Sequence, residues 1–317
     1  MNLLKSHRPG FWIFVAAPVV LAVAIAGFII VVRESPAEGQ GAEDRETYTR
    51  KTDEELAGSE YMPSEEEQLK TANDQLSAKL EGLVENAGLP EGATVSIAVS
   101  DGTYTGGAGA EVEHSGASLT KLEVLAMLVD HYGDPEEIPG WVDGLMAEMI
   151  TESKNEATDR LLFNVLGGFP DLEEAHGKFG LEGTHEHEIR RWGYTVTTAA
   201  DQLHLLDVML SSDSEHFDEA QRDYMLDLLS RVESDQDWGV SAATEGDYWV
   251  KNGWDTRPDL DIPWVVHSAG VLDAESGEEP VRMVIMTSGF DSLEDGVAAV
   301  ESLSPQVRAL LTATAGS

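Results

Sequence analysis

A serine and a lysine stand three residues apart, at Ser118 and Lys121, where the sequence predicts the beginning of a helix. Residues i and i+3 lie on the same face of a helix, so the hydroxyl and the amine are expected to be neighbours near the positive end of the helix dipole. A neutral lysine can accept the hydroxyl proton, provided that its pKa falls from about 10 to about 7. The pair therefore indicates nucleophilic catalysis, although the same spacing also occurs at the beginning of ordinary surface helices.

Lysine is rare in the second part of the chain, which makes the positions that keep it informative. After residue 90 the only lysines are at positions 121, 154, 178 and 251. Two of them belong to short polar groups, Ser153-Lys154-Asn155 at the end of a predicted helix and Lys251-Asn252-Gly253 at the end of a predicted strand. We expect these groups to meet Ser118 and Lys121 in one cleft.

The elements that position these groups follow from the periodicity of apolar residues. A capping box at Ser64 and Glu67 opens a helix that runs towards Gly88. The region from about 118 to 232 is helical in pattern. Strands are predicted at 94–100, 103–105, 248–251, 264–272 and 281–287, and a final helix at 293–311. This order predicts an α+β fold with one antiparallel sheet, N- and C-terminal helices on the sheet, and a helical lobe beside it.

The three polar groups, in this order along the chain, resemble the Ser-x-x-Lys, Ser-x-Asn and Lys-Thr-Gly motifs of the class A β-lactamase and penicillin-binding protein superfamily. The resemblance covers about residues 90–311. It extends to the stretch 197–203, which precedes a predicted helix, and to the strand 264–272. It implies a β-lactamase-like serine hydrolase with a transpeptidase-like fold.

The resemblance also implies a role for each residue. Ser118 would be the acylated nucleophile, Lys121 its base, and Ser153 the relay of a proton to the leaving nitrogen. The residues implied in substrate binding are Asn155, which orients Lys121 and the substrate, Lys251, which attracts a carboxylate, and Asn252, Gly253 and Trp254. The backbone amides of Ser118 and Trp254 would form the oxyanion hole.

Two residues depart from the motifs of that superfamily. Lys154 replaces the Asp that is usual in class A enzymes, and it either helps to lower the pKa of Lys121 or points to solvent. Asn252 stands where Thr or Ser is usual, which weakens one contact to a substrate carboxylate.

The stretch from Gly180 to Thr197 departs further. Class A enzymes have there a Glu, followed four residues later by Asn, which activates the deacylating water. Glu182, Glu186 and Glu188 are followed at that spacing by Glu, Arg and Trp, so no pair fits. We therefore expect slow hydrolysis of the acyl-enzyme, unless one of these glutamates reaches the water.

Two other groups have simpler interpretations. His185-Glu-His-Glu188 lacks a fixed third partner for a metal ion and is interpreted as a loop. Gly106-Gly-Ala-Gly109 lacks the Gly-Lys-Ser/Thr of a phosphate loop and is interpreted as a turn between strand and helix. We expect neither a metal nor a cofactor.

The N-terminal region predicts a membrane anchor. Residues 11–32 are 22 uncharged residues, enough to cross a hydrocarbon core of about 30 Å. Lys5 and Arg8 precede this span, so residues 1–10 are expected in the cytoplasm and the rest outside the cell membrane, as a single-pass protein. The alternative is a cleaved signal peptide, since Ala24-Ile-Ala26 resembles a cleavage site.

The next segment, 33–64, is rich in acidic residues and has no apolar periodicity, so it is interpreted as a disordered tether before a folded domain at 65–317. The whole chain has 59 Asp and Glu against 20 Lys and Arg, a formal charge of −39, and no cysteine. Such a charge excludes nucleic-acid binding through a basic surface. The acids are spread along the chain, which favours adaptation to a salty medium over an acidic patch for cations or basic partners.

The sequence thus predicts an enzyme that acylates Ser118 on a β-lactam or on a cell-wall peptide related to D-Ala-D-Ala. The rival hypothesis is a catalytically silent module of the same fold that binds peptidoglycan or a partner protein.

Overall fold

The computed structural model describes residues 63–274 and 279–316. The predicted cytoplasmic tail (1–10), the membrane span (11–32) and nearly all of the acidic linker (33–64) lie outside the described residues. Within those residues, no helix has the length and hydropathy of a membrane span.

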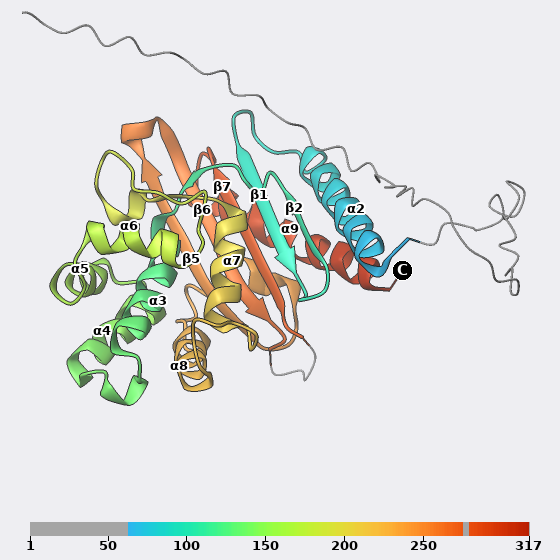
Figure 1. Ribbon diagram of the computed structural model, residues 1–317. Coiled ribbons are helices and arrows are strands. Elements are labelled where there is room, and N and C mark those ends of the chain that lie inside the picture. Colours follow the sequence, from blue (N-terminus) through green and yellow to red (C-terminus); the bar gives the residue numbers. More distant parts are fainter. Residues whose placement is uncertain (1–62, 275–278, 317) are drawn as a thin grey trace, which may run out of the picture. The chain divides into compact units, whose positions relative to one another are not determined.

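An antiparallel sheet forms the centre of the described part of the chain, with the strand order β2-β1-β7-β6-β5 (Figure 1). Its strands are β1 (Thr94–Ser100), β2 (Thr105–Ala108), β5 (Tyr248–Arg257), β6 (Ile262–Leu272) and β7 (Val281–Ser288). The register pairs Ile97 with Ile285 and Lys251 with Ala269. Two short strands, β3 (His114–Ser115) and β4 (Val196–Thr197), pair separately.

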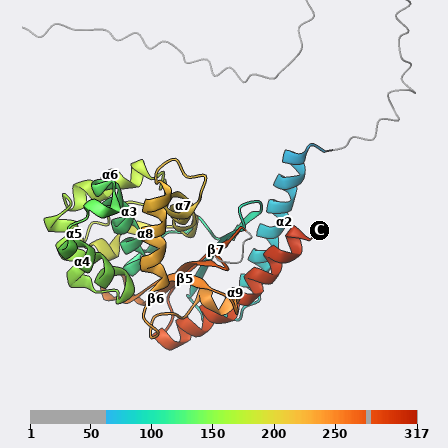
Figure 2. The same ribbon diagram turned by 90° about the horizontal axis from the view of Figure 1, so that it is seen from below.

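Helices cover both faces of the sheet, as Figure 2 shows. One face carries α2 (Glu65–Glu85), which begins at the predicted capping box of Ser64 and Glu67, and α9 (Leu293–Ala315). The other face carries the helical lobe, which consists of α3 (Thr120–Tyr132), α4 (Gly140–Thr151), α5 (Asn155–Asn164), α6 (Phe169–Lys178), α7 (Ala199–Leu210) and α8 (Glu219–Ser230). The predicted α+β architecture is confirmed.

The central strand β7 contributes to the hydrophobic core on both sides of the sheet. Met283 and Ile285 belong to the cluster beneath α2 and α9, whereas Val284 and Met286 belong to the cluster that fills the helical lobe. Because successive side chains of a strand point to opposite faces, a strand that is buried on both sides is a continuous apolar run.

The interpretation of Gly106 to Gly109 as a turn is wrong for all but Gly109, which follows β2 at a turn. Gly106 and Gly107 lie in β2, which begins at Thr105 and continues beyond the strand expected at 103–105. A Cβ atom at Gly106 would lie 2.6 Å from Cγ of Leu76 in α2. Glycine therefore allows α2 to pass closely over this edge strand.

Strand β5 is longer than the sequence predicts. It continues beyond Lys251 to Arg257 and pairs with β6 across a register shift between Asp255 and Arg257. This extension brings Trp254, Asp255 and Arg257 to the pocket described below.

Candidate active site

Ser118 lies in a single 3-10 turn, η1 (Ala117–Leu119), directly before α3. The helix thus begins two residues later than the motif alone predicts, yet Lys121 Nζ still lies within hydrogen-bond distance of Ser118 Oγ, at 3.0 Å. Ala117 has a φ of 48°, in the left-handed region that non-glycine residues rarely adopt. Strained backbone of this kind is typical of functional sites.

Lys121 is fully buried and surrounded by oxygen atoms. Its Nζ donates to the carbonyl oxygen of Ser153 at 2.6 Å, to Ser153 Oγ at 3.0 Å and to Asn155 Oδ1 at 2.9 Å. Burial lowers the pKa of Lys121 to about 7, against the opposing effect of the carboxylates of Asp159 and Glu156. A substantial fraction of this amine is therefore neutral at neutral pH and able to accept a proton.

Ser153 lies between two lysines. Its Oγ accepts a hydrogen bond from Lys121 Nζ and another, at 2.9 Å, from Lys251 Nζ. Burial and the nearby Lys121 amine lower the pKa of Lys251 well below its ordinary value. A hydroxyl in contact with two such amines can pass a proton onward, as the relay predicted for Ser153 requires.

Strand β5 packs against the turn that carries Ser118. A Cβ atom at Gly253 would lie 2.9 Å from the backbone nitrogen of Ser118 and 3.0 Å from that of Leu119. The neighbouring residue Trp254 lines the same pocket as Ser118. The oxyanion hole expected from the backbone amides of Ser118 and Trp254 stays a prediction, although both residues line one pocket.

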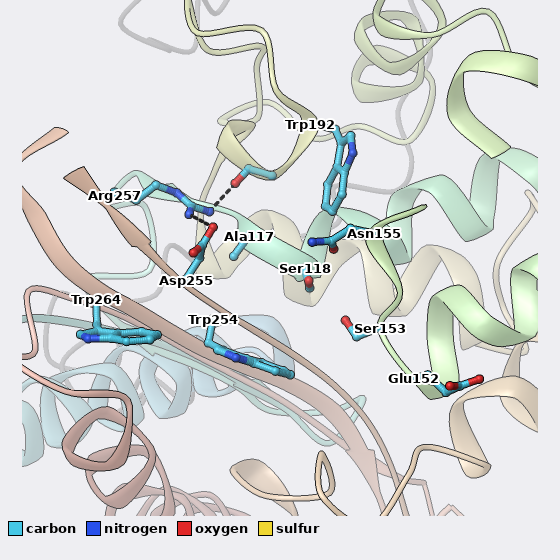
Figure 3. Close-up of a pocket in the computed structure, with 11 residues that line it drawn as sticks. Ala117, Ser118, Glu152, Ser153, Asn155, Trp192, Trp254, Asp255, Arg257 and Trp264 are labelled. Carbon is cyan, nitrogen blue, oxygen red and sulfur yellow. Dashed lines mark hydrogen bonds and ion pairs between the residues drawn. The ribbon is translucent and has the colours of Figure 1, made fainter. Parts of the chain in front are cut away.

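Figure 3 shows the pocket above these groups, with Ser118, Ser153 and Asn155 directed into one space and Trp192 across it from Trp254. Its volume is about 330 Å³. Its lining residues are Ala117, Ser118, Glu152, Ser153, Asn155, Trp192, Gly193, Trp254, Asp255, Arg257 and Trp264. Lys121 contacts this pocket through Ser118, Ser153 and Asn155.

Lys251, Asn252 and Gly253 do not line the pocket. The side-chain amide of Asn252 donates instead to the carbonyl oxygens of Gln236 and Trp238, both at 2.8 Å. Lys251 reaches the pocket through Ser153. Direct contacts of Lys251 and Asn252 with a substrate carboxylate therefore stay predictions.

The segment before Ser118 is held by two residues that the sequence analysis missed. His267 Nε2 donates to the carbonyl oxygen of Ser115 at 2.8 Å, and Arg257 Nε donates to Ser115 Oγ at 2.7 Å. Burial lowers the pKa of His267 to about 3, with a smaller effect of the adjacent His114, so the ring is neutral. Arg257 is also buried, and its Nη2 donates to the carbonyl oxygen of Gly193 at 2.7 Å.

The comparisons with known proteins agree with this geometry. The sequence model of the beta-lactamase enzyme family matches residues 141–311, more than half of the chain. The chain belongs to this family. The comparison with curated proteins gave no match.

Solved class A β-lactamases and a penicillin-binding protein share the fold of this family member. A class A β-lactamase from Bacteroides cellulosilyticus is 16% identical, with a TM-score of 0.61 over 76% of this chain and 99% of that one. An ancestral class A β-lactamase is 19% identical, with a TM-score of 0.58 over 75% of this chain and 99% of that one. A mutant of PBP-A, solved as an acyl-enzyme complex with penicillin G, is 18% identical, with a TM-score of 0.59 over 77% and 97%.

In this β-lactamase family member, the glutamates of the 180–197 stretch lie away from the pocket. Glu182, Glu186 and Glu188 do not line it, and Glu186 forms an ion pair with Arg190 at 3.0 Å. Trp192, four residues after Glu188, lines the pocket instead.

The two carboxylates that do line the pocket are each paired with a cation. Glu152 accepts a hydrogen bond from Lys154 at 3.0 Å, and Asp255 accepts one from Arg257. Lys154 also lies 3.7 Å from Glu148, and its side chain is 41% exposed. Of the two alternatives for Lys154, the structure therefore favours the one in which it points to solvent, and burial is the cause that lowers the pKa of Lys121.

Three of the pocket residues that the sequence analysis missed, Trp192, Asp255 and Arg257, come from two distant segments. Trp192 follows Glu188 at the spacing expected for a catalytic Asn, so its position in the sequence was a usable signal. Asp255 and Arg257 alternate with Gly253 along β5, but the sequence predicted that this strand ends at Lys251.

Proposed function

We propose that the protein is a membrane-anchored, extracytoplasmic serine hydrolase that acylates Ser118 with a β-lactam or a D-Ala-D-Ala-like cell-wall peptide. The observation that carries the proposal is the contact of Lys121 Nζ with Ser118 Oγ at 3.0 Å. A serine in contact with an amine of lowered pKa is an activated nucleophile.

The arrangement supports the following acylation. Lys121 Nζ accepts the Ser118 hydroxyl proton while Oγ attacks the carbonyl carbon of the substrate amide. The backbone amides of Ser118 and Trp254 stabilise the negative oxygen of the tetrahedral intermediate. The carbon–nitrogen bond then breaks, and Ser153 passes the proton from Lys121 to the leaving nitrogen. The products are an ester at Ser118 and a neutral amine, which for a β-lactam stays attached to the acyl group because the ring has opened.

We propose further that the acyl-enzyme is hydrolysed slowly. A deacylating water requires a general base within hydrogen-bond distance. The two carboxylates that line the pocket, Glu152 and Asp255, are each engaged by a cation. A trapped or transferred acyl group therefore fits this site better than rapid hydrolysis of β-lactams.

The proposed location rests on residues 11–32, whose length and lack of charge are typical of a membrane span. The bases before this span support a catalytic domain on the outer side of the cell membrane. Retention of the protein in membranes washed with alkaline carbonate tests the anchor, and release into the wash would contradict it.

Labelling with a fluorescent penicillin tests the proposed chemistry. The full chain, purified in detergent, is expected to retain the label through denaturing electrophoresis, and Ser118→Ala is expected to lose it. Ser302→Ala, at an exposed position of α9, is the matched control and should label as the wild type does.

Turnover of nitrocefin then separates trapping from hydrolysis, because a trapped acyl-enzyme gives a single burst of product. Absence of labelling by penicillin and by an acyl-D-Ala-D-Ala mimic would favour the rival hypothesis of a catalytically silent binding module.

A further inference from the structure

The indole of Trp192 covers the catalytic amine. Its ring lies over Lys121 Nζ, with 5.1 Å between Nζ and the ring centroid. Trp192 also lines the pocket beside Ser118 and Asn155 (Figure 3). The ring of Trp192 therefore lies next to both Lys121, the proposed base, and Ser118, the residue that is acylated.

The other sides of the amine are occupied by protein oxygens. Ser118 Oγ, the carbonyl oxygen and Oγ of Ser153, and Asn155 Oδ1 all lie within 3.0 Å of Lys121 Nζ. A water molecule that is to donate a proton to Nζ must come within about 3 Å of it. Such a water has to displace one of these oxygens or the ring of Trp192.

Trp192 is held in this place from two directions. Its Nε1 donates to Asp159 Oδ1 at 2.7 Å, which ties the ring to α5. The carbonyl oxygen of the next residue, Gly193, accepts a hydrogen bond from the buried guanidinium of Arg257 at 2.7 Å. The ring is therefore fixed to α5, and the backbone next to it is fixed to β5, so that the ring forms one wall of the pocket.

We propose that Trp192, oriented by Asp159, is a shielding residue that keeps water away from Lys121 and from the ester on Ser118, and so prolongs the life of the acyl-enzyme. This inference rests on the proposed acylation of Ser118. It assigns to Trp192 a function in the second half of the reaction only, because acylation needs no water.

Removal of the ring opens a hydrolytic route. Water attacks the ester carbonyl carbon, and its proton passes to Lys121 Nζ. The bond between that carbon and Ser118 Oγ breaks, and Oγ takes the proton from Lys121. The products are the free enzyme and the hydrolysed acyl group, so no further reactant is required.

The test compares the lifetimes of acyl-enzymes. The full chain and its variants are labelled with a fluorescent penicillin, the excess is removed, and the loss of label is followed together with the rate of labelling. In Trp192→Ala the deacylation rate constant is expected to rise at least about tenfold, while the labelling rate changes less than about threefold. Trp192→Phe keeps a ring over the amine but loses the hydrogen bond to Asp159, so its lifetime is expected to lie between those of the wild type and Trp192→Ala.

Two further variants separate shielding from a general structural effect. Asp159→Ala frees the indole and is expected to shorten the lifetime by less than Trp192→Ala does. Trp141→Ala removes an indole that is 55% exposed and lies outside the pocket, so it should leave the lifetime unchanged. Thermal unfolding of each variant shows whether the fold is kept.

An unchanged lifetime in Trp192→Ala, with the label formed normally, would overturn this inference and leave the proposed acylation intact. A lifetime in Trp192→Phe as short as that in Trp192→Ala would also overturn it. Absence of label on the wild type would instead overturn the proposed function, and this inference with it.

Discussion

The protonation state of one amine decides whether the site can react. Burial favours the neutral form of Lys121, whereas the carboxylates of Asp159 and Glu156 favour the charged form. The balance places the pKa at about 7, against an ordinary value of 10.5. Lys121 is therefore a base that becomes available near neutral pH.

The first prediction concerns the pH dependence of acylation. Because a protonated Lys121 cannot accept the Ser118 proton, the rate of penicillin labelling should fall about tenfold per pH unit below about 7 and level off above it. Labelling rates from pH 5.5 to 9 provide the measurement. A rate that is independent of pH, or that falls as the pH rises through 7, would contradict this assignment.

Lysine variants supply the control for this profile. Lys121→Met should lower the labelling rate by about 100-fold or more, since it removes the general base. Lys178→Met removes a half-exposed lysine that is paired with Asp130, and it should keep both the rate and the profile.

Site residues can be predicted from the sequence when they are close to one another along the chain, or when they belong to motifs that follow one another in a fixed order. Ser118 and Lys121 meet because three residues span one helical turn, and Ser153 and Asn155 meet Lys121 as the ordered motifs imply. Trp192 could not be placed over Lys121 in this way, because that contact depends on how a distant loop packs.

At the scale of elements, the site depends on how closely β5 approaches the turn η1. Gly253 makes this approach possible, because a Cβ atom there would meet the backbone nitrogens of Ser118 and Leu119. These backbone nitrogens cannot move aside as the end of a flexible side chain can. Strand β5 can therefore lie this close to Ser118 because the side chain of residue 253 is a single hydrogen atom.

The second prediction is that Gly253→Ala moves the nucleophile. The added methyl group would lie 2.9 Å from the nitrogen of Ser118, so the strand or the turn must shift by a few tenths of an ångström or more. Acylation should slow by about 100-fold, as expected when reacting groups are misplaced. Stability should fall by about 1–3 kcal/mol, measured by urea unfolding.

Gly144→Ala is the matched control, since a Cβ atom at this position in α4 meets nothing within 4 Å. It should keep the labelling rate and raise stability by about 0.5–1 kcal/mol. Normal labelling of Gly253→Ala would show that β5 does not set the geometry of the nucleophile.

The order and type of the helices and strands could largely be predicted from the sequence, but the residues at which they begin and end could not. Strand β7 was predicted because its two-sided burial requires a continuous apolar run. The extension of β5 to Arg257 was missed because its polar residues, Asp255 and Thr256, do not look like a strand interior. The glycines of β2 could not be assigned to a strand from the sequence, because the close passage of α2 is a tertiary contact.

The net charge of −39 causes repulsion between like charges within the molecule, and this repulsion opposes folding. Salt reduces this repulsion, because the screening length falls from about 10 Å at 0.1 M to about 3 Å at 1 M. We interpret this charge as an adaptation to a salty medium, separate from the chemistry of Ser118 and Lys121 in the pocket.

The third prediction is that salt stabilises the protein. Raising KCl from about 0.1 M to 2 M should increase the unfolding temperature by several degrees, through screening of like charges. Differential scanning calorimetry of the full chain provides the measurement, with sucrose as an uncharged control for solvent exclusion. An unfolding temperature that stays constant or falls with KCl would contradict the interpretation of the acidic surface.

The central claim is that Ser118 forms a covalent acyl-enzyme, and intact-mass spectrometry tests it most directly. After incubation with penicillin G, the full chain should gain the mass of one whole penicillin, because opening the ring adds the drug without losing an atom. Ser118→Ala should gain nothing. An unmodified wild type across the pH range in which Lys121 is neutral, or an adduct that persists in Ser118→Ala, would contradict the claim.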